Sequence, residues 1–219
     1  MTRVKICGIK EEAHARTVSE AGGDFIGVVF APSRRQVTPE QARRIAGAVR
    51  ECRQTTAVVG VFVNMPAAEV NRLARICNLD WVQLSGDEPW EYCRQITKPL
   101  IKAVRIGHDR NYEDICADLR MGAGVLSDQK YLYLLDSQVK DKYGGTGTTF
   151  DWSLAQRIAA RFPVILAGGL TPENVAQAVG VSAPWGVDVS SGVEVGGVKD
   201  AAKIRDFIAA VRGADGNKK

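Results

Sequence analysis

Short runs of β-branched and other apolar residues alternate along the chain with longer segments in which apolar residues recur at helical spacing. This alternation predicts βα units that build a parallel sheet. Successive apolar runs begin 19 to 33 residues apart, about the length of one strand, one helix and their connections. Eight runs are predicted as strands: Val4–Cys7, Phe25–Phe30, Ala57–Val63, Trp81–Leu84, Leu100–Arg105, Tyr131–Asp136, Val164–Ala167 and Gly186–Val189.

Helix-start signals fall between the predicted strands. Thr38-Pro39-Glu40 combines a capping residue with a proline that fits the first helical position. The same signal recurs at Thr171-Pro172-Glu173, and we expect a helix to begin there. The last predicted helix is Lys203–Val211, and residues 213–219 (GADGNKK) are expected to be a disordered tail.

Eight such units favour a compact (β/α)8 barrel, the TIM barrel, whose size range begins near ~200 residues. The alternative is an open, doubly wound α/β sheet, which typically has fewer strands. Neither a linker nor a low-complexity insert interrupts the pattern. We therefore expect one catalytic barrel domain, residues 1–212, followed by the tail.

Composition and charge narrow the class of protein. The chain has 29 Lys and Arg against 25 Asp and Glu, and a net charge of +4 gives little indication of a nucleic-acid partner. No apolar run approaches the ~18 residues that span a membrane, and no signal peptide is visible. Five widely spaced cysteines without a C-x-x-C motif indicate a reducing compartment, and with two histidines they disfavour a metal site. We expect a cytoplasmic protein that binds no metal.

The clearest candidate chemistry follows the last two strands. In such a barrel the active site lies at the carboxyl ends of the strands, and the loops after strands seven and eight commonly bind phosphate. Gly168-Gly169 and Ser190-Ser191-Gly192 occupy these loops. Glycines let backbone N–H groups approach a phosphate, and a helix start adds a favourable dipole. Each motif alone could be an ordinary turn, but together they predict a phosphate site.

Two other strand ends carry groups that can transfer protons. Cys7 ends the first strand, with Lys5 and Lys10 close in sequence, so it could form a thiolate. Most strand cysteines are instead small apolar residues of a core. Asp136 ends the sixth strand, where an apolar surrounding can raise the pKa of a carboxyl and make it a general acid. Its alternative role is to anchor the loop that follows.

Further candidates lie at the same end. Asp188 is either a hydroxyl-binding carboxylate or a loop anchor, and Arg34 or Arg35 could pair with a carboxylate. The glycine-rich loop within 137–149 lacks the spacing and the lysine of a nucleotide-binding loop, so we expect a mobile cover over the site. His108 follows the fifth strand, and a direct role for it is not favoured.

Two motifs are specific: KICG at residues 5–8 and DVSSGVE at residues 188–194. Through them the chain resembles the phosphoribosylanthranilate isomerase family of tryptophan biosynthesis. Other matching stretches run in family order along nearly the whole chain: DFIGVVF at 24–30, SRR at 33–35, TPEQAR at 38–43, VGVFVN at 59–64, VQL at 82–84, LLDS at 134–137, YGGTG at 143–147, FDW at 150–152 and AGGLTPENV at 167–175.

The resemblance implies an Amadori rearrangement of N-(5-phosphoribosyl)anthranilate to 1-(2-carboxyphenylamino)-1-deoxyribulose 5-phosphate, without a metal or an organic cofactor. It implies Cys7 as the general base, Asp136 as the general acid and Arg35 near the anthranilate end. The family's phosphate loops fall on the two glycine-containing motifs above. The only partner implied is this phosphorylated small molecule, with neither nucleic acid nor a membrane, and the chain is expected to be a monomer or a homodimer.

One departure from the family and two alternatives remain. The family usually has a histidine after Leu84, whereas this chain reads Leu84-Ser85-Gly86-Asp87-Glu88, and we expect that histidine to be dispensable. A related aldose–ketose isomerase of histidine biosynthesis is expected to use aspartates at both catalytic positions, so Cys7 argues against it. A barrel that only binds a phosphorylated metabolite would not need Cys7 and Asp136.

Overall fold

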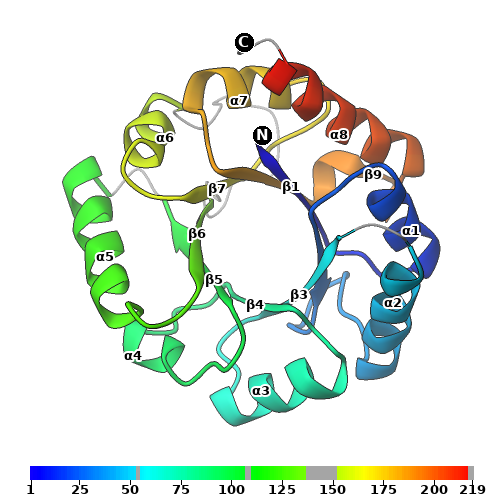
Figure 1. Ribbon diagram of the computed structural model, residues 1–219, viewed down its shortest axis with the longest axis horizontal. Coiled ribbons are helices and arrows are strands. Elements are labelled where there is room, and N and C mark those ends of the chain that lie inside the picture. Colours follow the sequence, from blue (N-terminus) through cyan, green and yellow to red (C-terminus); the bar gives the residue numbers. More distant parts are fainter. Residues whose placement is uncertain (53–54, 107–109, 137–151, 217–219) are drawn as a thin grey trace.

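Eight parallel strands close into a barrel in the computed structural model, and helices surround it (Figure 1). The structure describes residues 1–52, 55–106, 110–136 and 152–216. The barrel strands are β1 (Arg3–Cys7), β2 (Phe25–Val29), β3 (Ala57–Phe62), β4 (Trp81–Leu84), β5 (Leu100–Arg105), β6 (Tyr131–Asp136), β7 (Val164–Ala167) and β8 (Gly186–Val189). The helices are α1 (Glu12–Glu20), α2 (Pro39–Glu51), α3 (Ala67–Ile76), α4 (Trp90–Cys93), α5 (Tyr112–Val125), α6 (Trp152–Ala159), α7 (Val175–Ser182) and α8 (Ala201–Gly216).

The predicted TIM barrel is therefore confirmed, and the open sheet is not formed. Each strand pairs in parallel with the next, and β8 pairs with β1 through Lys5 opposite Asp188. A 3₁₀ turn, η1 (Ser191–Val193), and a small antiparallel hairpin, β9 (Glu194–Val195) with β10 (Val198–Lys199), follow β8. The sequence pattern did not predict this hairpin.

Alternation along the strands divides the apolar residues into two layers. One buried cluster draws its members from the strands alone and fills the barrel interior: Phe25, Val59, Trp81, Ile101, Leu132, Leu134, Ile165 and Ala167. The second, larger cluster joins the outer face of the strands to the helices. Lys5, Gln83 and Asp188 also belong to the inward-facing set by alternation, and all three are buried. The interior thus carries polar groups toward one end.

The helix starts illustrate one correct and one wrong prediction. The Thr38 side chain accepts from the Gln41 amide and the Gln41 side chain accepts from the Thr38 amide, so α2 begins at Pro39 as expected. Helix α7 begins at Val175, not at Pro172. Asn174 accepts from the Thr171 amide and donates to the Gly169 carbonyl. The preceding segment therefore shapes the loop after β7 instead of extending the helix.

The carboxyl end of α8 corrects the expected domain boundary. The helix continues to Gly216, so residues 213–216 are not a frayed tail. The Asp215 carboxylate accepts from the Thr2 amide and the Thr2 hydroxyl, both at 2.7 Å, which ties this last turn to the start of β1. Residues 217–219 lie outside the described part of the chain. None of the described helices is long and apolar enough to cross a membrane.

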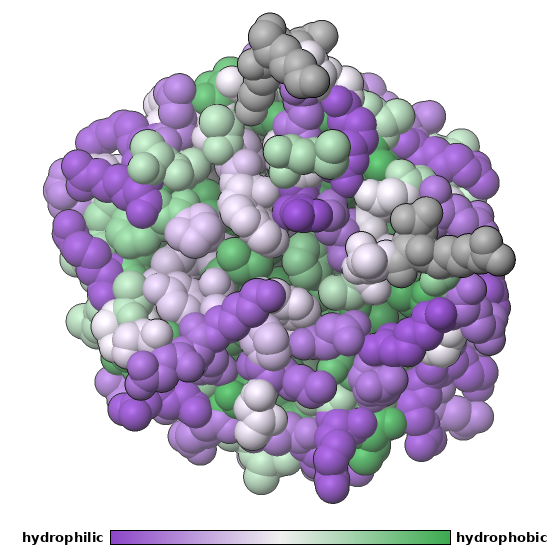
Figure 2. All heavy atoms as spheres, viewed as in Figure 1, coloured by the Kyte–Doolittle hydropathy of each residue, from purple (hydrophilic) through white to green (hydrophobic). Residues whose placement is uncertain are grey.

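Figures 1 and 2 look onto the end of the barrel at which the strands begin. A hollow of about 500 Å³ opens there, and its lining includes Phe25, Trp81, Trp185 and Lys130. Phe25 meets Trp81 edge-on with ring centroids 5.8 Å apart, and the Lys130 ammonium lies 5.1 Å from the Trp81 ring centre. None of the predicted site residues lines this hollow, in keeping with a structural role for this end.

Candidate active site

The predicted acid and base lie at the opposite end of the barrel. Cys7 is the last residue of β1, and Asp136 is the last residue of β6, where it pairs with Arg105 and Ala167. Because all eight strands are parallel, both residues reach the same mouth. Cys7 is 9% exposed and Asp136 is half-buried. The mouth therefore holds a thiol and a carboxyl on different walls.

A buried ion pair lies beneath Cys7. Lys5 and Cys7 are two residues apart on β1, so their side chains share the inner face. The Lys5 ammonium donates to Asp188 at 2.9 Å, and Lys5 is 1% exposed. A methyl group on Gly27 of β2 would lie 2.8 Å from the Cys7 sulfur and 3.2 Å from the Lys5 nitrogen. The absent side chain at Gly27 leaves room for both groups.

The pKa of the Cys7 thiol reflects these neighbours. Burial raises it, the Lys5 ammonium lowers it and the Asp188 carboxylate raises it again. The result lies above the ordinary value for a cysteine. Burial therefore favours the thiol form of Cys7, and the Lys5 ammonium acts in the opposite direction.

Arg35 belongs to a charge cluster beside the end of β1. Its guanidinium donates to both oxygens of Glu194, at 2.7 and 3.0 Å. Arg34 and Lys199 each donate to the same carboxylate at 2.8 Å. A methyl group on Gly8 would lie 2.4 Å from the Arg35 Cδ, so the Arg35 stem crosses Gly8 directly after Cys7. Three cations share one carboxylate, which leaves excess positive charge at the mouth.

The two predicted phosphate loops meet at the same end. Gly168 and Gly169 have φ angles of 98° and 63°, in the left-handed region that favours glycine. A methyl group on Gly169 would face open space. One on Gly192 would come within 1.9 Å of the Leu170 carbonyl oxygen, so only glycine lets the loop after β8 lie against the loop after β7. The Ser190 hydroxyl donates to the Cys7 carbonyl at 3.1 Å, and Ser191 is exposed.

Ser85 follows β4 at this mouth. The Gln83 side-chain nitrogen donates to the Ser85 hydroxyl at 3.0 Å. The Gln83 side-chain oxygen is buried and has no hydrogen-bond partner among the described residues. Arg105 donates to the Ser85 carbonyl at 3.4 Å and to Asp87 at 2.8 Å. A polar group of the barrel interior therefore faces the position where the family's histidine is missing.

The structure brings together the predicted residues at the seam of β1 and β8. It adds three that sequence reasoning missed, Gln83, Glu194 and Lys199, and it shows that Lys5 pairs with Asp188. The Lys10 ammonium instead donates to the Arg34 carbonyl at an exposed site. A lysine two residues before Cys7 in an apolar strand was the available signal for Lys5. His108 and the loop 137–149 lie outside the described residues, and the described ones contain no cluster suited to a metal ion.

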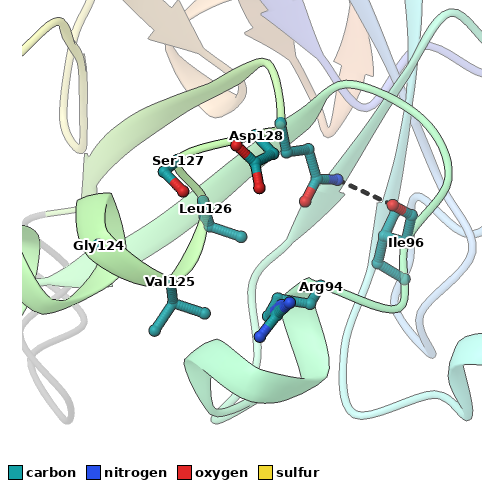
Figure 3. A pocket seen from close by; sticks show the side chains of 8 residues that line it. Arg94, Ile96, Gly124, Val125, Leu126, Ser127 and Asp128 are labelled. Carbon is teal, nitrogen blue, oxygen red and sulfur yellow. Dashed lines mark hydrogen bonds between the residues drawn. The ribbon is translucent and has the colours of Figure 1, made fainter.

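A second hollow, of about 590 Å³, lies beside α4 (Figure 3). Arg94 and Ile96 line it from one side, and the turn from α5 to β6, including Asp128, lines it from the other (Figure 3). Gln129 donates to the Ile96 carbonyl at 2.8 Å across it. Both lining segments lead into strand starts, so this hollow lies at the end away from Cys7. Its position separates it from the candidate site.

The closed barrel and its mouth define a (β/α)8-barrel enzyme. The model of the N-(5'-phosphoribosyl)anthranilate (PRA) isomerase family matches residues 4–210. A relative of that name from Dehalococcoides mccartyi is 44% identical over 218 residues, which is 100% of this chain and 99% of the relative. The chain therefore belongs to the phosphoribosylanthranilate isomerase family, the isomerases of tryptophan biosynthesis. This result favours phosphoribosylanthranilate isomerase activity over the histidine-biosynthesis isomerase and over a barrel that only binds a phosphorylated metabolite.

Solved structures agree with this assignment. Phosphoribosylanthranilate isomerase from Thermotoga maritima superposes with a TM-score of 0.82 at 41% identity, covering 97% of this chain and 100% of that one. A second isomerase structure, in complex with reduced 1-(o-carboxyphenylamino)-1-deoxyribulose 5-phosphate, has a TM-score of 0.79 at 39% identity with the same coverage. A third structure, with a TM-score of 0.78 at 38% identity, is of monomers generated from the dimeric T. maritima isomerase.

The cluster around Glu194 predicts an acid-sensitive stability. Burial raises the pKa of Glu194, but hydrogen bonds from Arg35 and Lys199 outweigh burial and lower the pKa to about 2, from 4.5. The folded state therefore favours the carboxylate. Its stabilising contribution is present above pH 4.5 and is lost as the pH falls toward 2. A shift of this size corresponds to about 3 kcal/mol.

We expect Glu194→Gln to lower the free energy of unfolding at pH 7 and to flatten its dependence on pH between 4.5 and 2. Urea titrations at pH 7, 4.5 and 3 measure both effects. Glu12→Gln, which removes an exposed ion pair with Arg44, is the matched control and should keep the parent's pH dependence. Equal pH dependence in Glu194→Gln and the parent would contradict the prediction.

Proposed function

We propose that this isomerase performs the Amadori rearrangement with Cys7 as general base and Asp136 as general acid. The observation that carries the proposal is the presence of both groups at one barrel mouth, at the ends of β1 and β6. A relative binds a reduced form of the deoxyribulose phosphate product. We extend that ligand chemistry to this chain.

The proposed steps need one acid and one base. Asp136, as a carboxylic acid, donates its proton to the furanose ring oxygen, and the ring opens to a Schiff base between C1 and the anthranilate nitrogen. The Cys7 thiolate then removes the proton from C2, and the electrons of that C–H bond form the enolamine. Tautomerisation of the enolamine gives the ketone at C2. Each proton transfer contributes roughly 10²–10⁴-fold.

We propose the loops after β7 and β8 as the phosphate site. Gly168, Gly169, Ser190, Ser191 and Gly192 supply it. The left-handed backbone at the two β7 glycines, the open space in front of Gly169 and the contact of Gly192 with Leu170 support this position. Asn174 holds the first loop through the Gly169 carbonyl. Loops of this kind bind anions through backbone N–H groups.

We assign the anthranilate carboxylate to Arg35 and a sugar hydroxyl to Asp188. The Arg35 cluster has three cations for one carboxylate, so it can accept a second carboxylate from the substrate. One carboxylate oxygen of Asp188 accepts from the Lys5 ammonium, and the other can accept a hydrogen bond from a sugar hydroxyl. The dimeric relative favours a homodimer over a monomer for this chain. We retain a single catalytic domain, now extended to residue 216 by α8.

Replacing either catalytic group should nearly abolish turnover. We expect Cys7→Ser and Asp136→Asn each to lower kcat by roughly 10²-fold or more, because each removes one proton transfer. Loss of fluorescence of freshly generated phosphoribosylanthranilate measures turnover. Cys52→Ser, at a half-buried cysteine after α2, is the control and should match the parent. Turnover within a fewfold of the parent in a folded Cys7→Ser variant would rule out Cys7 as the base.

The phosphate site can be tested with two side chains of equal size at Gly169. Both Gly169→Asn and Gly169→Asp place a side chain in the open space and share the same backbone cost. Only Asp adds a charge that repels a phosphate. We expect KM of the Asp variant to exceed that of the Asn variant by roughly 10-fold or more, about 1.4 kcal/mol. Equal KM values would place the phosphate elsewhere.

Ser85→His tests the missing family histidine. The Ser85 hydroxyl accepts from Gln83, and we assign it no proton transfer. We therefore expect kcat to change by less than about tenfold on restoring the histidine. A gain of about a hundredfold, nearly 3 kcal/mol of barrier, would show that the histidine matters. Stopped-flow or steady-state turnover at one saturating substrate concentration is sufficient.

A further inference from the structure

Lys5 is the most deeply buried charged side chain among the residues that the structure describes, and the reaction as proposed leaves it without a role. It is 1% exposed and pairs with Asp188 at 2.9 Å. A buried ion pair is a weak source of stability, because desolvation of both ions offsets most of their attraction. Stability alone therefore gives a poor account of a lysine at this position.

The geometry directs Lys5 toward Cys7. Both side chains project from the same face of β1, and the space left by Gly27 is shared by the Cys7 sulfur and the Lys5 nitrogen. Asp188 reaches the ammonium from β8, where it is the register partner of Lys5. Asp188 thus holds the ammonium near the sulfur, in the space left open by Gly27.

Several charged groups act on the Cys7 sulfur. They are Lys5 on β1, Asp188 on β8, Lys199 on β10 and Arg35 after β2. Lys199 and Arg35 each pair with Glu194, which weakens their effect on the thiol. Lys5 is the strongest of the groups that lower the pKa of Cys7. The Asp188 carboxylate raises the pKa of Cys7 and so acts against Lys5.

Asp188 nevertheless keeps Lys5 charged. Burial lowers the pKa of Lys5, but attraction to Asp188 and to Cys7 outweighs burial and raises the pKa above the ordinary value. Lys5 is therefore an ammonium throughout the neutral range. A fixed positive charge beside a sulfur stabilises the thiolate over the thiol.

We propose that Lys5, held by Asp188, is the positioning residue that stabilises the thiolate of Cys7 and so makes the base available for the C2 proton. When the thiolate forms, the thiol proton leaves to solvent; when the thiolate takes the C2 proton, the thiol is restored. Lys5 keeps its own protons throughout and touches no substrate atom. This inference rests on the proposed role of Cys7.

The test compares the pH dependence of Cys7 alkylation by iodoacetamide in the ligand-free parent, Lys5→Met and Lys5→Arg. Modification is followed by peptide mass spectrometry, and Cys52 in the same molecule is the internal reference. Methionine keeps the length of the side chain without the charge, and arginine keeps the charge. We expect Lys5→Met to move the alkylation midpoint of Cys7 upward by about one pH unit or more. Lys5→Arg should restore most of this shift.

The turnover of the same variants gives a second readout. We expect Lys5→Met to lower kcat at pH 7.5 at least ~10-fold, with a smaller change in KM and partial recovery at higher pH. A merely structural role would lower kcat equally at every pH. An unchanged midpoint of Cys7 alkylation in folded Lys5→Met overturns the inference.

A second variant, which lacks both charges of the Lys5–Asp188 pair, keeps the inference testable if Lys5→Met does not fold. Lys5→Met with Asp188→Asn removes both members of the ion pair, and its reference is the parent. Because Lys5 acts more strongly on the Cys7 thiol than Asp188 does, we expect the double variant to have the higher midpoint, and an equal or lower midpoint overturns the inference. The proposed function fails by a different result. If Cys7→Ser retains turnover, Cys7 is not the base, whereas the alkylation midpoints of the parent and the Lys5 variants are unaffected by that result.

Discussion

The pairing of β1 with β8 closes the barrel, and the position of every group at the mouth depends on it. Lys5 and Asp188, 183 residues apart in sequence, become neighbours only at this seam. The Ser190 hydroxyl reaches the Cys7 carbonyl across the same seam. At the other end, Thr2 and Asp215 join the first strand to the last helix. Without closure, Lys5 would not meet Asp188, and the end of β1 that carries the thiol would not meet the loop after β8.

Charge is distributed unevenly around this seam. Below the sulfur, one ammonium faces one carboxylate, and both are shielded from solvent. Above it, Arg34, Arg35 and Lys199 converge on Glu194. The inner pair is neutral overall, whereas the outer cluster has a surplus of positive charge. A dianionic phosphate and a carboxylate would be attracted to the outer layer, while the inner layer lies next to Cys7, the proposed base.

The strand pattern was predictable because each strand carries a short, dense apolar signal and the units recur at regular length. The start of α7 was not predictable from the sequence. Thr171-Pro172 has the composition of a helix cap, but the Asn174 side chain hydrogen-bonds within this segment and shapes it as a loop. Their place after a strand made Arg34 and Arg35 candidates, and the family resemblance selected Arg35. Its partner Glu194 was not found, because a contact between residues 159 positions apart leaves no local pattern. Lys5 was noted only as a sequence neighbour of Cys7, and the alternation of β1 alone cannot reveal its pairing with β8.

The hydrogen bond from Ser190 to the Cys7 carbonyl has a mechanical consequence. It links the backbone that carries the thiol to the loop that we propose for the phosphate, and Lys199 also contacts this loop through the Ser190 carbonyl. If the phosphate binds where we propose, its binding energy can help to orient the Cys7 sulfur, the proposed base, toward C2. Binding at the proposed phosphate site thus helps to orient the proposed base at the other end of the substrate.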